Sequence, residues 1–117
     1  MANATSEEFP HRVRIVRSTD YRMLYREGRK IQSVRFVLFV RENGIGYHRL
    51  GLTVSRKVGG AVVRNRIKRL FREIFRRSSV EIPGQYDIVV NAKSGCVGAS
   101  YIELHAEFLA SAKKLYR

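Results

Sequence analysis

The chain has 117 residues, a formal net charge of +13 and a pI near 10.7. A hydrophobic fraction of 44% with 10% aromatic residues indicates a folded domain and argues against a basic disordered tail. The charge exceeds what solubility requires, so it points to a polyanionic partner. The single cysteine, Cys96, excludes an internal disulfide and fits a reducing compartment, so we expect a cytoplasmic protein.

The N-terminal end and the length of the apolar runs bear on domain organisation. Residues 1–8 have neither a basic start nor an apolar stretch, which argues against a secretion signal. We expect them to form a mobile leader before a single domain over residues 9–117. The longest apolar run, Phe36 to Val40, is far too short to span a bilayer.

Two short elements are predicted at the start of the domain. Basic and apolar residues alternate over 12–17, which predicts a short edge strand. Ser18 or Thr19 can cap a helix over residues 19–27, and Gly28 follows as its C-terminal stop.

A strand over residues 34–41 follows, and its two sides differ in kind. The side that we expect to face the core is wholly apolar: Val34, Phe36, Leu38 and Val40. The other side mixes cations with apolar groups: Arg35, Val37, Phe39 and Arg41. An aromatic ring between cations suits the stacking of unpaired bases. Coverage of Phe39 by a second helix or by the N-terminal segment explains the pattern equally well.

The next segment has the signals of a β-hairpin. Asn43-Gly44 with Gly46 predicts the turn, and a return strand follows at about residues 48–55. Its alternating sides are expected to carry Leu50, Leu52 and Val54 on one side and Gly51, Thr53 and Ser55 on the other.

A strongly basic amphipathic helix is predicted over residues 62–77. Its expected buried stripe consists of Val63, Ile67, Leu70, Phe71 and Ile74. From Arg64 to Arg77 there are seven Arg or Lys residues and one acid, Glu73, which can pair with Arg77. The exposed face is expected to carry Asn65, Arg69, Arg72 and Arg76. Like charges stacked four residues apart destabilise an isolated helix, which favours phosphate binding over a merely solvated face.

The C-terminal third predicts one more strand and helix. Pro83-Gly84 turns the chain into a strand over 86–91, and a loop runs from Lys93 to Ala99. Ser100 and Glu103 have capping-box spacing and open a helix whose buried side is expected to carry Tyr101, Leu104, Phe108, Ala112 and Leu115. The predicted order is β-α-β-β-α-β-α, an α+β sandwich with helices packed on a small sheet.

The residue combinations that would make this chain a catalyst by itself are missing. Its ten acids are scattered, and no cluster suits a pair of metal ions. The three histidines fall on separate predicted elements and, with one cysteine, have no recognisable zinc spacing. The sequence therefore predicts a binding protein with neither catalytic nor metal-ligating residues.

The segment Arg56-Lys57-Val58-Gly59-Gly60-Ala61-Val62-Val63-Arg64-Asn65-Arg66-Ile67-Lys68-Arg69 resembles the protein subunit of bacterial ribonuclease P, in which an Arg-Asn-Arg motif opens a basic helix. The resemblance covers roughly residues 12–117. The weaker matches lie at Asp20-Tyr21, Tyr25, Gly28, Arg49 to Ser55 and Tyr86 to Val90. It implies a mostly antiparallel sheet with a left-handed β-α-β crossover, like domain 2 of ribosomal protein S5.

The resemblance also implies a function. The enzyme is an endoribonuclease that removes the 5′ leader of precursor tRNA, and its RNA subunit performs the metal-dependent chemistry. The protein would bind the catalytic RNA subunit and the leader, raising substrate affinity and improving the use of magnesium, which the RNA subunit and substrate mainly hold. No membrane and no obligate protein partner is expected.

The implied site residues fall into two sets. The expected RNA-subunit contacts are Arg56, Lys57, Arg64, Asn65, Arg66, Lys68, Arg69 and Arg72. The expected leader cleft consists of Tyr21, Tyr25, Arg35, Val37, Phe39, Thr53 and Ser55. The family commonly has phenylalanine at the positions of Tyr21 and Tyr25, and tyrosine at the position of Phe39. Stacking survives these exchanges, but a hydroxyl hydrogen bond from the strand to a leader base is lost.

Three other interpretations stay open from the residues alone. The first is a ribosomal or other structural RNA-binding protein, which needs the basic helix but no aromatic cleft. The second is a free-standing nuclease. The third is a basic amphipathic helix that targets a membrane surface.

Overall fold

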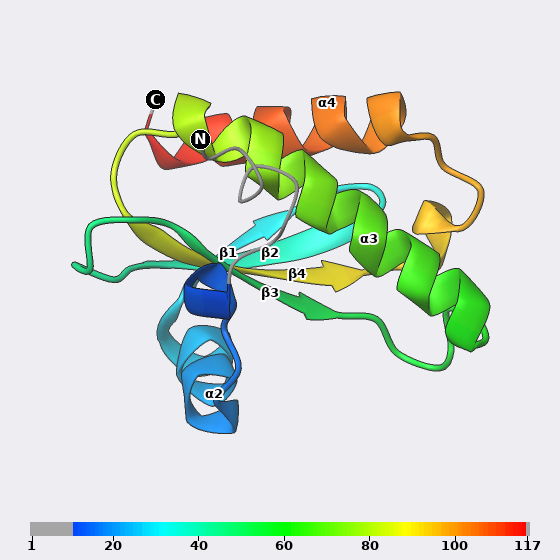
Figure 1. Cartoon of the computed structure of the whole chain (residues 1–117), viewed down its shortest axis with the longest axis horizontal. Coiled ribbons are helices and arrows are strands. Elements are labelled where there is room, and N and C mark those ends of the chain that lie inside the picture. Colours follow the sequence, from blue (N-terminus) through cyan, green and yellow to red (C-terminus); the bar gives the residue numbers. More distant parts are fainter. Residues whose placement is uncertain (1–10, 117) are drawn as a thin grey trace.

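The structure, a computed structural model, describes residues 11–116, with α3 and α4 on one face of a sheet and α2 on the other (Figure 1). The leader expected over residues 1–8 lies outside this range. The helices and strands are α2 (Ser18–Glu27), β1 (Arg29–Gln32), β2 (Phe36–Glu42), β3 (Arg49–Thr53), α3 (Ala61–Ser78), β4 (Tyr86–Ala92) and α4 (Tyr101–Ala112). Short 3₁₀ turns occupy His11–Val13, Ser79–Glu81, Ser94–Cys96 and Lys113–Leu115.

The four strands form one mixed sheet in the order β1-β2-β4-β3. β1 pairs with β2 and β2 with β4 in antiparallel orientation, whereas β3 and β4 are parallel. Parallel neighbours need a crossover, and α3 provides it as the helix of a β-α-β unit. The predicted α+β fold with a mostly antiparallel sheet is confirmed.

The predicted hairpin between residues 34–41 and 48–55 is wrong in its pairing. The turn signals are real, because Gly44 and Gly46 have φ values of 67° and 92°. However, β4 lies between the two strands and pairs with both. Ile88, Val89 and Val90 of β4 are all 0% exposed, so this strand requires apolar cover on both faces and takes a central position.

The predicted strand over residues 12–17 is reduced to a single bridge. Arg14 forms an isolated parallel bridge with Leu50, and the Ile15 amide donates to the Leu50 carbonyl at 2.9 Å. The segment therefore does lie at the edge of the sheet, but not as a strand. The first true strand is β1, which has no clear sequence pattern because only Ile31 of its four residues is buried.

The core lies between α3, α4 and one face of the sheet. Ile67, Phe71 and Ile74 are at most 1% exposed, and the Phe71 ring meets Phe36 edge-on with ring centroids 5.4 Å apart. The buried stripe of α3 is confirmed at these three residues, whereas Val63 and Leu70 are only partly buried against the core, and Phe75 is a buried member that was not predicted. On β2 the predicted core side holds for three residues but fails at Val34, which is 84% exposed because it lies in the turn before the strand.

The helix ends follow local chemistry to different degrees. The predicted capping box of α4 is confirmed: the Glu103 amide donates to Ser100 Oγ at 3.1 Å, and the Ser100 amide donates to Glu103 Oε1 at 2.9 Å. The predicted cap of α2 is wrong, since Arg17 takes the N-cap position without a side-chain bond. Gly28 does end α2, but at a φ of −74°; a Cβ atom there would lie 2.5 Å from the Leu24 carbonyl oxygen.

The substitution Ile67→Asp tests the buried stripe of α3. It places an uncompensated carboxylate at a fully buried position, which should cost about 3–5 kcal/mol and largely abolish cooperative melting. The matched control is Val62→Asp on the first turn of the same helix, where the side chain is 85% exposed. Thermal unfolding by circular dichroism should show the control melting like wild type; equal melting of both variants would contradict the packing.

Candidate nucleic-acid interface

The face of the sheet that turns toward α2 presents two short rows of residues. Strand register aligns Val37, Asn91 and Thr53 across β2, β4 and β3. The neighbouring row aligns Phe39, Val89 and Gly51. α2 packs on the second row, because Leu24 and Val89 share a small cluster with Ile15, against which Tyr21 and Phe39 pack. Thr53 and Asn91 beside it stay partly exposed.

Tyr25 joins α2 to the first row. Tyr25 is 38% exposed as a whole residue, and its ring meets Phe39 edge-on, with ring centroids 4.9 Å apart. Its hydroxyl donates to Asn91 Oδ1 at 3.0 Å and therefore accepts from the Thr53 hydroxyl, 2.8 Å away. The predicted cleft residues Tyr25, Phe39 and Thr53 are thus brought together. Asn91 was missed, although the alternation of β4 could have placed it two residues beyond Val89 on the same face.

Tyr21 lies on the other side of Tyr25, with the two ring centroids 6.4 Å apart. Its hydroxyl accepts a hydrogen bond from the Leu52 amide at 3.2 Å, and burial raises the pKa of its phenol. Gly51 makes this approach possible, because a Cβ atom there would lie only 2.8 Å from the Tyr21 hydroxyl oxygen. The three rings consequently form one continuous aromatic group along α2 and β2.

Arg35 does not join this group, so its predicted place is wrong. Its guanidinium lies 3.1 Å from Glu107 Oε1 and 3.6 Å from Glu103 Oε2, both on α4, which covers the opposite face (Figure 1). A cation beside the Phe39 ring is instead Lys30, whose Nζ lies 5.9 Å from the ring centroid. Of the remaining predicted cleft residues, Val37 lies in the first row at 9% exposure, and Ser55 is exposed just after β3.

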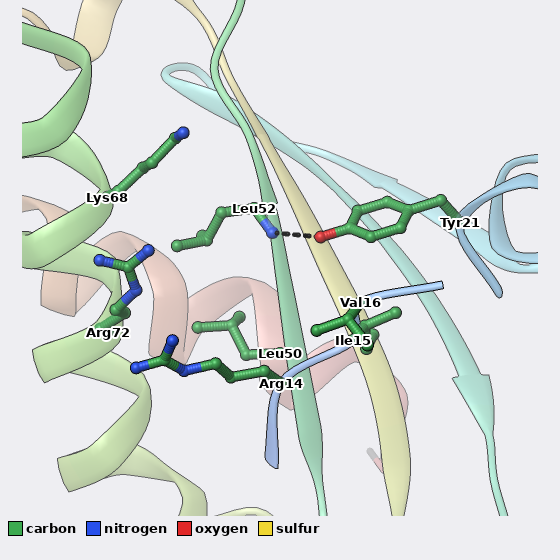
Figure 2. A pocket seen from close by; sticks show the side chains of 8 residues that line it. All are labelled: Arg14, Ile15, Val16, Tyr21, Leu50, Leu52, Lys68 and Arg72. Carbon is green, nitrogen blue, oxygen red and sulfur yellow. Dashed lines mark hydrogen bonds between the residues drawn. The ribbon is translucent and has the colours of Figure 1, made fainter. Parts of the chain in front are cut away.

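The predicted RNA-subunit residues spread over several sides of α3. Asn65 and Arg69 are exposed on its outer side, and Arg56 and Lys57 are exposed in the loop before it. Two arginines are partly buried and donate to backbone carbonyls: Arg64 to Gly59 at 3.1 Å and Arg66 to Ala99 at 3.2 Å. Lys68 and Arg72 instead line a pocket between α3 and β3 (Figure 2).

The acid on α3 neutralises more charge than expected. Glu73 pairs with Arg77 as predicted, but its carboxylate also accepts two hydrogen bonds from Arg76 at 3.1 and 2.7 Å. The bonds from Arg76 and Arg77 hold the pKa of Glu73 below its ordinary value. The helix is therefore partly neutralised toward its C-terminal end, and among the described residues no ion pair involves the cations from Arg64 to Arg72.

Two other kinds of site, a metal-ion cluster and a membrane-spanning helix, are absent from residues 11–116. In that range no three His, Cys, Asp or Glu side chains gather into a group that could hold a metal ion. None of the helices there is both long and apolar enough to cross a membrane. A small α+β domain with a basic helix and an aromatic sheet face is typical of RNA-binding proteins, and this chain is of that class.

Comparison with known proteins identifies the family. The family described as Ribonuclease P matches residues 9–116. The ribonuclease P protein component of Alkaliphilus oremlandii is 35% identical over 102 residues, which cover 87% of this chain and 90% of that protein. The component of Thermotoga maritima is 45% identical over 85 residues, 73% of each protein.

Solved structures agree with the sequence matches. The RNase P protein from Staphylococcus aureus superposes with a TM-score of 0.80 at 30% identity, covering 89% of this chain and 95% of that one. The RNase P protein from Thermotoga maritima gives a TM-score of 0.80 at 35% identity, covering 86% and 96%. The chain belongs to the ribonuclease P protein family, which places it in an endoribonuclease complex of tRNA 5′ processing.

The substitution Glu107→Gln tests the placement of Arg35. Burial acts to raise the pKa of Glu107, but hydrogen bonds from Ser33 and from the amide and guanidinium of Arg35 outweigh it and hold the pKa below its ordinary value. A lowered pKa in the folded state stabilises the fold above the unfolded pKa of about 4.3 and loses that stability as the pH falls further.

Glu107→Gln should therefore lower the unfolding free energy at pH 7 by about 1.5–3 kcal/mol and flatten its decline on acidification below about pH 4.3. Urea unfolding between pH 3 and 7 measures both effects. Glu81→Gln is the control, because Glu81 is exposed and forms no ion pair with any described residue. Identical pH profiles for the Glu107 variant and wild type would show that Arg35 is not held as described.

Proposed function

We propose that this protein holds the single-stranded 5′ leader of precursor tRNA on the α2 face of its sheet and binds the catalytic RNA subunit of ribonuclease P through α3. In this proposal the RNA subunit carries out cleavage with magnesium held mainly by that RNA and the substrate. The protein raises the affinity for precursor tRNA and orients its leader, and it supplies no group that reacts in cleavage. The observation that carries the proposal is the continuous aromatic group of Tyr21, Tyr25 and Phe39 beside hydrogen-bonding side chains on the same sheet face.

The aromatic group suits single-stranded RNA for a physical reason. Unpaired bases stack on aromatic rings with little regard to sequence, at about 1–3 kcal/mol per base. A duplex offers no free base faces to these rings, so the leader is the natural ligand and mature tRNA is not. Thr53 and Asn91 add hydrogen-bonding groups at the floor of the same face. Lys30 adds a positive charge beside Phe39 for the phosphate backbone.

The outer side of α3 suits a folded RNA instead. Asn65 and Arg69 are exposed one turn apart, and Arg56 and Lys57 are exposed in the loop that precedes the helix. Side chains of this kind bind phosphates and fix register without reading bases. Such binding releases counterions from the RNA, so its affinity falls strongly as the salt concentration rises. A structural RNA-binding protein would need this surface alone, and the aromatic group is what separates the two functions.

The proposal predicts a magnesium effect that tests it directly. Cleavage of precursor tRNA should be compared at low magnesium with the RNA subunit alone and with the RNA subunit plus this protein. The protein should restore cleavage at magnesium concentrations where the RNA alone is slow, because it supplies binding energy and neutralises phosphate charge that magnesium would otherwise screen. Cleavage by the protein without any RNA subunit, or no effect of added protein, would overturn the proposal.

The substitution Phe39→Ala tests the leader site. Loss of one stacking ring should weaken binding of leader-bearing precursor tRNA to the holoenzyme by about 1–3 kcal/mol and leave binding of mature tRNA unchanged. Phe39→Tyr, which keeps the ring, is the matched control and should bind precursor like wild type. Equal losses on precursor and mature tRNA would mean that Phe39 only packs against Tyr25.

A further inference from the structure

A cationic pocket lies where α3 meets the outer edge of β3. Its cavity volume is about 220 Å³, and its apolar floor includes Leu50, Leu52 and Ile15. Figure 2 shows the charged ends of Arg14, Lys68 and Arg72 in the space between the helix and the strand. These cations come from two separate parts of the chain, the segment before α2 and helix α3. The pocket is therefore a product of the fold and not of one helix surface.

The charges of this pocket lie close together, and Lys68 and Arg72 are only partly exposed. Burial, reinforced by the neighbouring Arg14, lowers the pKa of Arg72. Neither Lys68 nor Arg72 forms an ion pair with an acid in the described part of the chain, and no described acid lines the pocket. Like charges at partly buried positions repel one another, and a bound anion relieves that repulsion. An anion with several oxygens would satisfy a guanidinium fork and a lysine ammonium at once.

We propose that this pocket binds one phosphate group of the leader strand, so that Lys68 and Arg72 belong to the substrate site and not to the RNA-subunit surface. The inference rests on the proposed function and assigns these two residues differently from what the family resemblance implied. Lys68 and Arg72 would bind the phosphate oxygens, and the charge of Arg14 lies close by in the same pocket.

Tyr21 is the reason for choosing the leader as the source of the phosphate. It lines the pocket and is also the first ring of the aromatic group, 6.4 Å from Tyr25 between ring centroids. Its hydroxyl bond to the Leu52 amide ties this ring to the edge of β3. A strand stacked on Tyr25 and Phe39 would therefore reach the pocket by passing Tyr21. The outer side of α3, with Asn65 and Arg69, faces solvent separately.

The first test titrates inorganic phosphate into the full chain and follows the arginine side-chain N–H signals by NMR. The Arg72 signal should shift and saturate at phosphate concentrations that leave the exposed Arg69 unaffected. Lys68→Gln should weaken this response, whereas Arg69→Gln should not. Equal responses of Arg72 and Arg69 would overturn the pocket as a phosphate site. This measurement involves no RNA, so it does not depend on the proposed function.

The second test identifies the source of the phosphate in the holoenzyme. Lys68→Gln and Arg72→Gln should each weaken binding of leader-bearing precursor about tenfold and lower its salt slope by about 0.7, as loss of a charged contact to a single strand predicts. Their affinity for the RNA subunit and for mature tRNA should be unchanged, and both should melt like wild type. Arg69→Gln is the matched control and should weaken only RNA-subunit binding.

The opposite pattern would overturn the inference. If Lys68→Gln and Arg72→Gln weaken RNA-subunit binding as Arg69→Gln does, the pocket belongs to the RNA-subunit surface. If precursor and mature tRNA lose equal affinity, the phosphate is not in the leader. If the wild-type holoenzyme binds precursor and mature tRNA equally, the proposed function is wrong and the leader is not the source of the phosphate. The phosphate titration would still show whether the pocket binds phosphate.

Discussion

The arrangement depends on the contact between the apolar underside of α3 and the sheet. Ile67, Phe71 and Ile74 are almost completely buried, and burial of each such side chain contributes about 1.5–3 kcal/mol. Repulsion between neighbouring cations on a helix costs only a few tenths of a kcal/mol per pair. Packing therefore outweighs repulsion, and a helix that would be unfavourable alone holds its arginines in fixed positions. Packing stabilises the helix, and in the described part of the chain the cations from Arg64 to Arg72 form no ion pair with an acid.

The central strand β4 couples this basic layer to the aromatic face. Ile88 and Val90 face the core under α3 and α4, whereas Val89 packs with Leu24 of α2. Asn91 continues the α2 side and receives the Tyr25 hydroxyl bond. Because the strand is paired on both edges, its register fixes which side chains meet across the sheet. One strand thus positions elements of both proposed RNA contacts.

Local signals predicted the helices well, and non-local pairing was the part that sequence could not supply. Periodicity located α3, and the Ser100–Glu103 box located the start of α4. The hairpin failed because the turn residues at Asn43-Gly44 specify a reversal of the chain but not the strand that pairs afterwards. Arg35 failed for the same reason, since its partner Glu107 lies on a helix at the other end of the sequence.

The departures from the family pattern change which group on the sheet face can bind a base. Tyr25 carries a hydroxyl where the family commonly has phenylalanine, but that hydroxyl is already bonded to Thr53 and Asn91. It therefore stiffens the ring and offers little to a ligand. Phe39 has no hydroxyl at all. In the proposed leader site, Asn91 can act as a donor, because its amide oxygen accepts from Tyr25 while its NH₂ group has two protons to donate. In that proposed site, this donor suits bases with acceptors on their exposed edges, such as uracil O4 or purine N7.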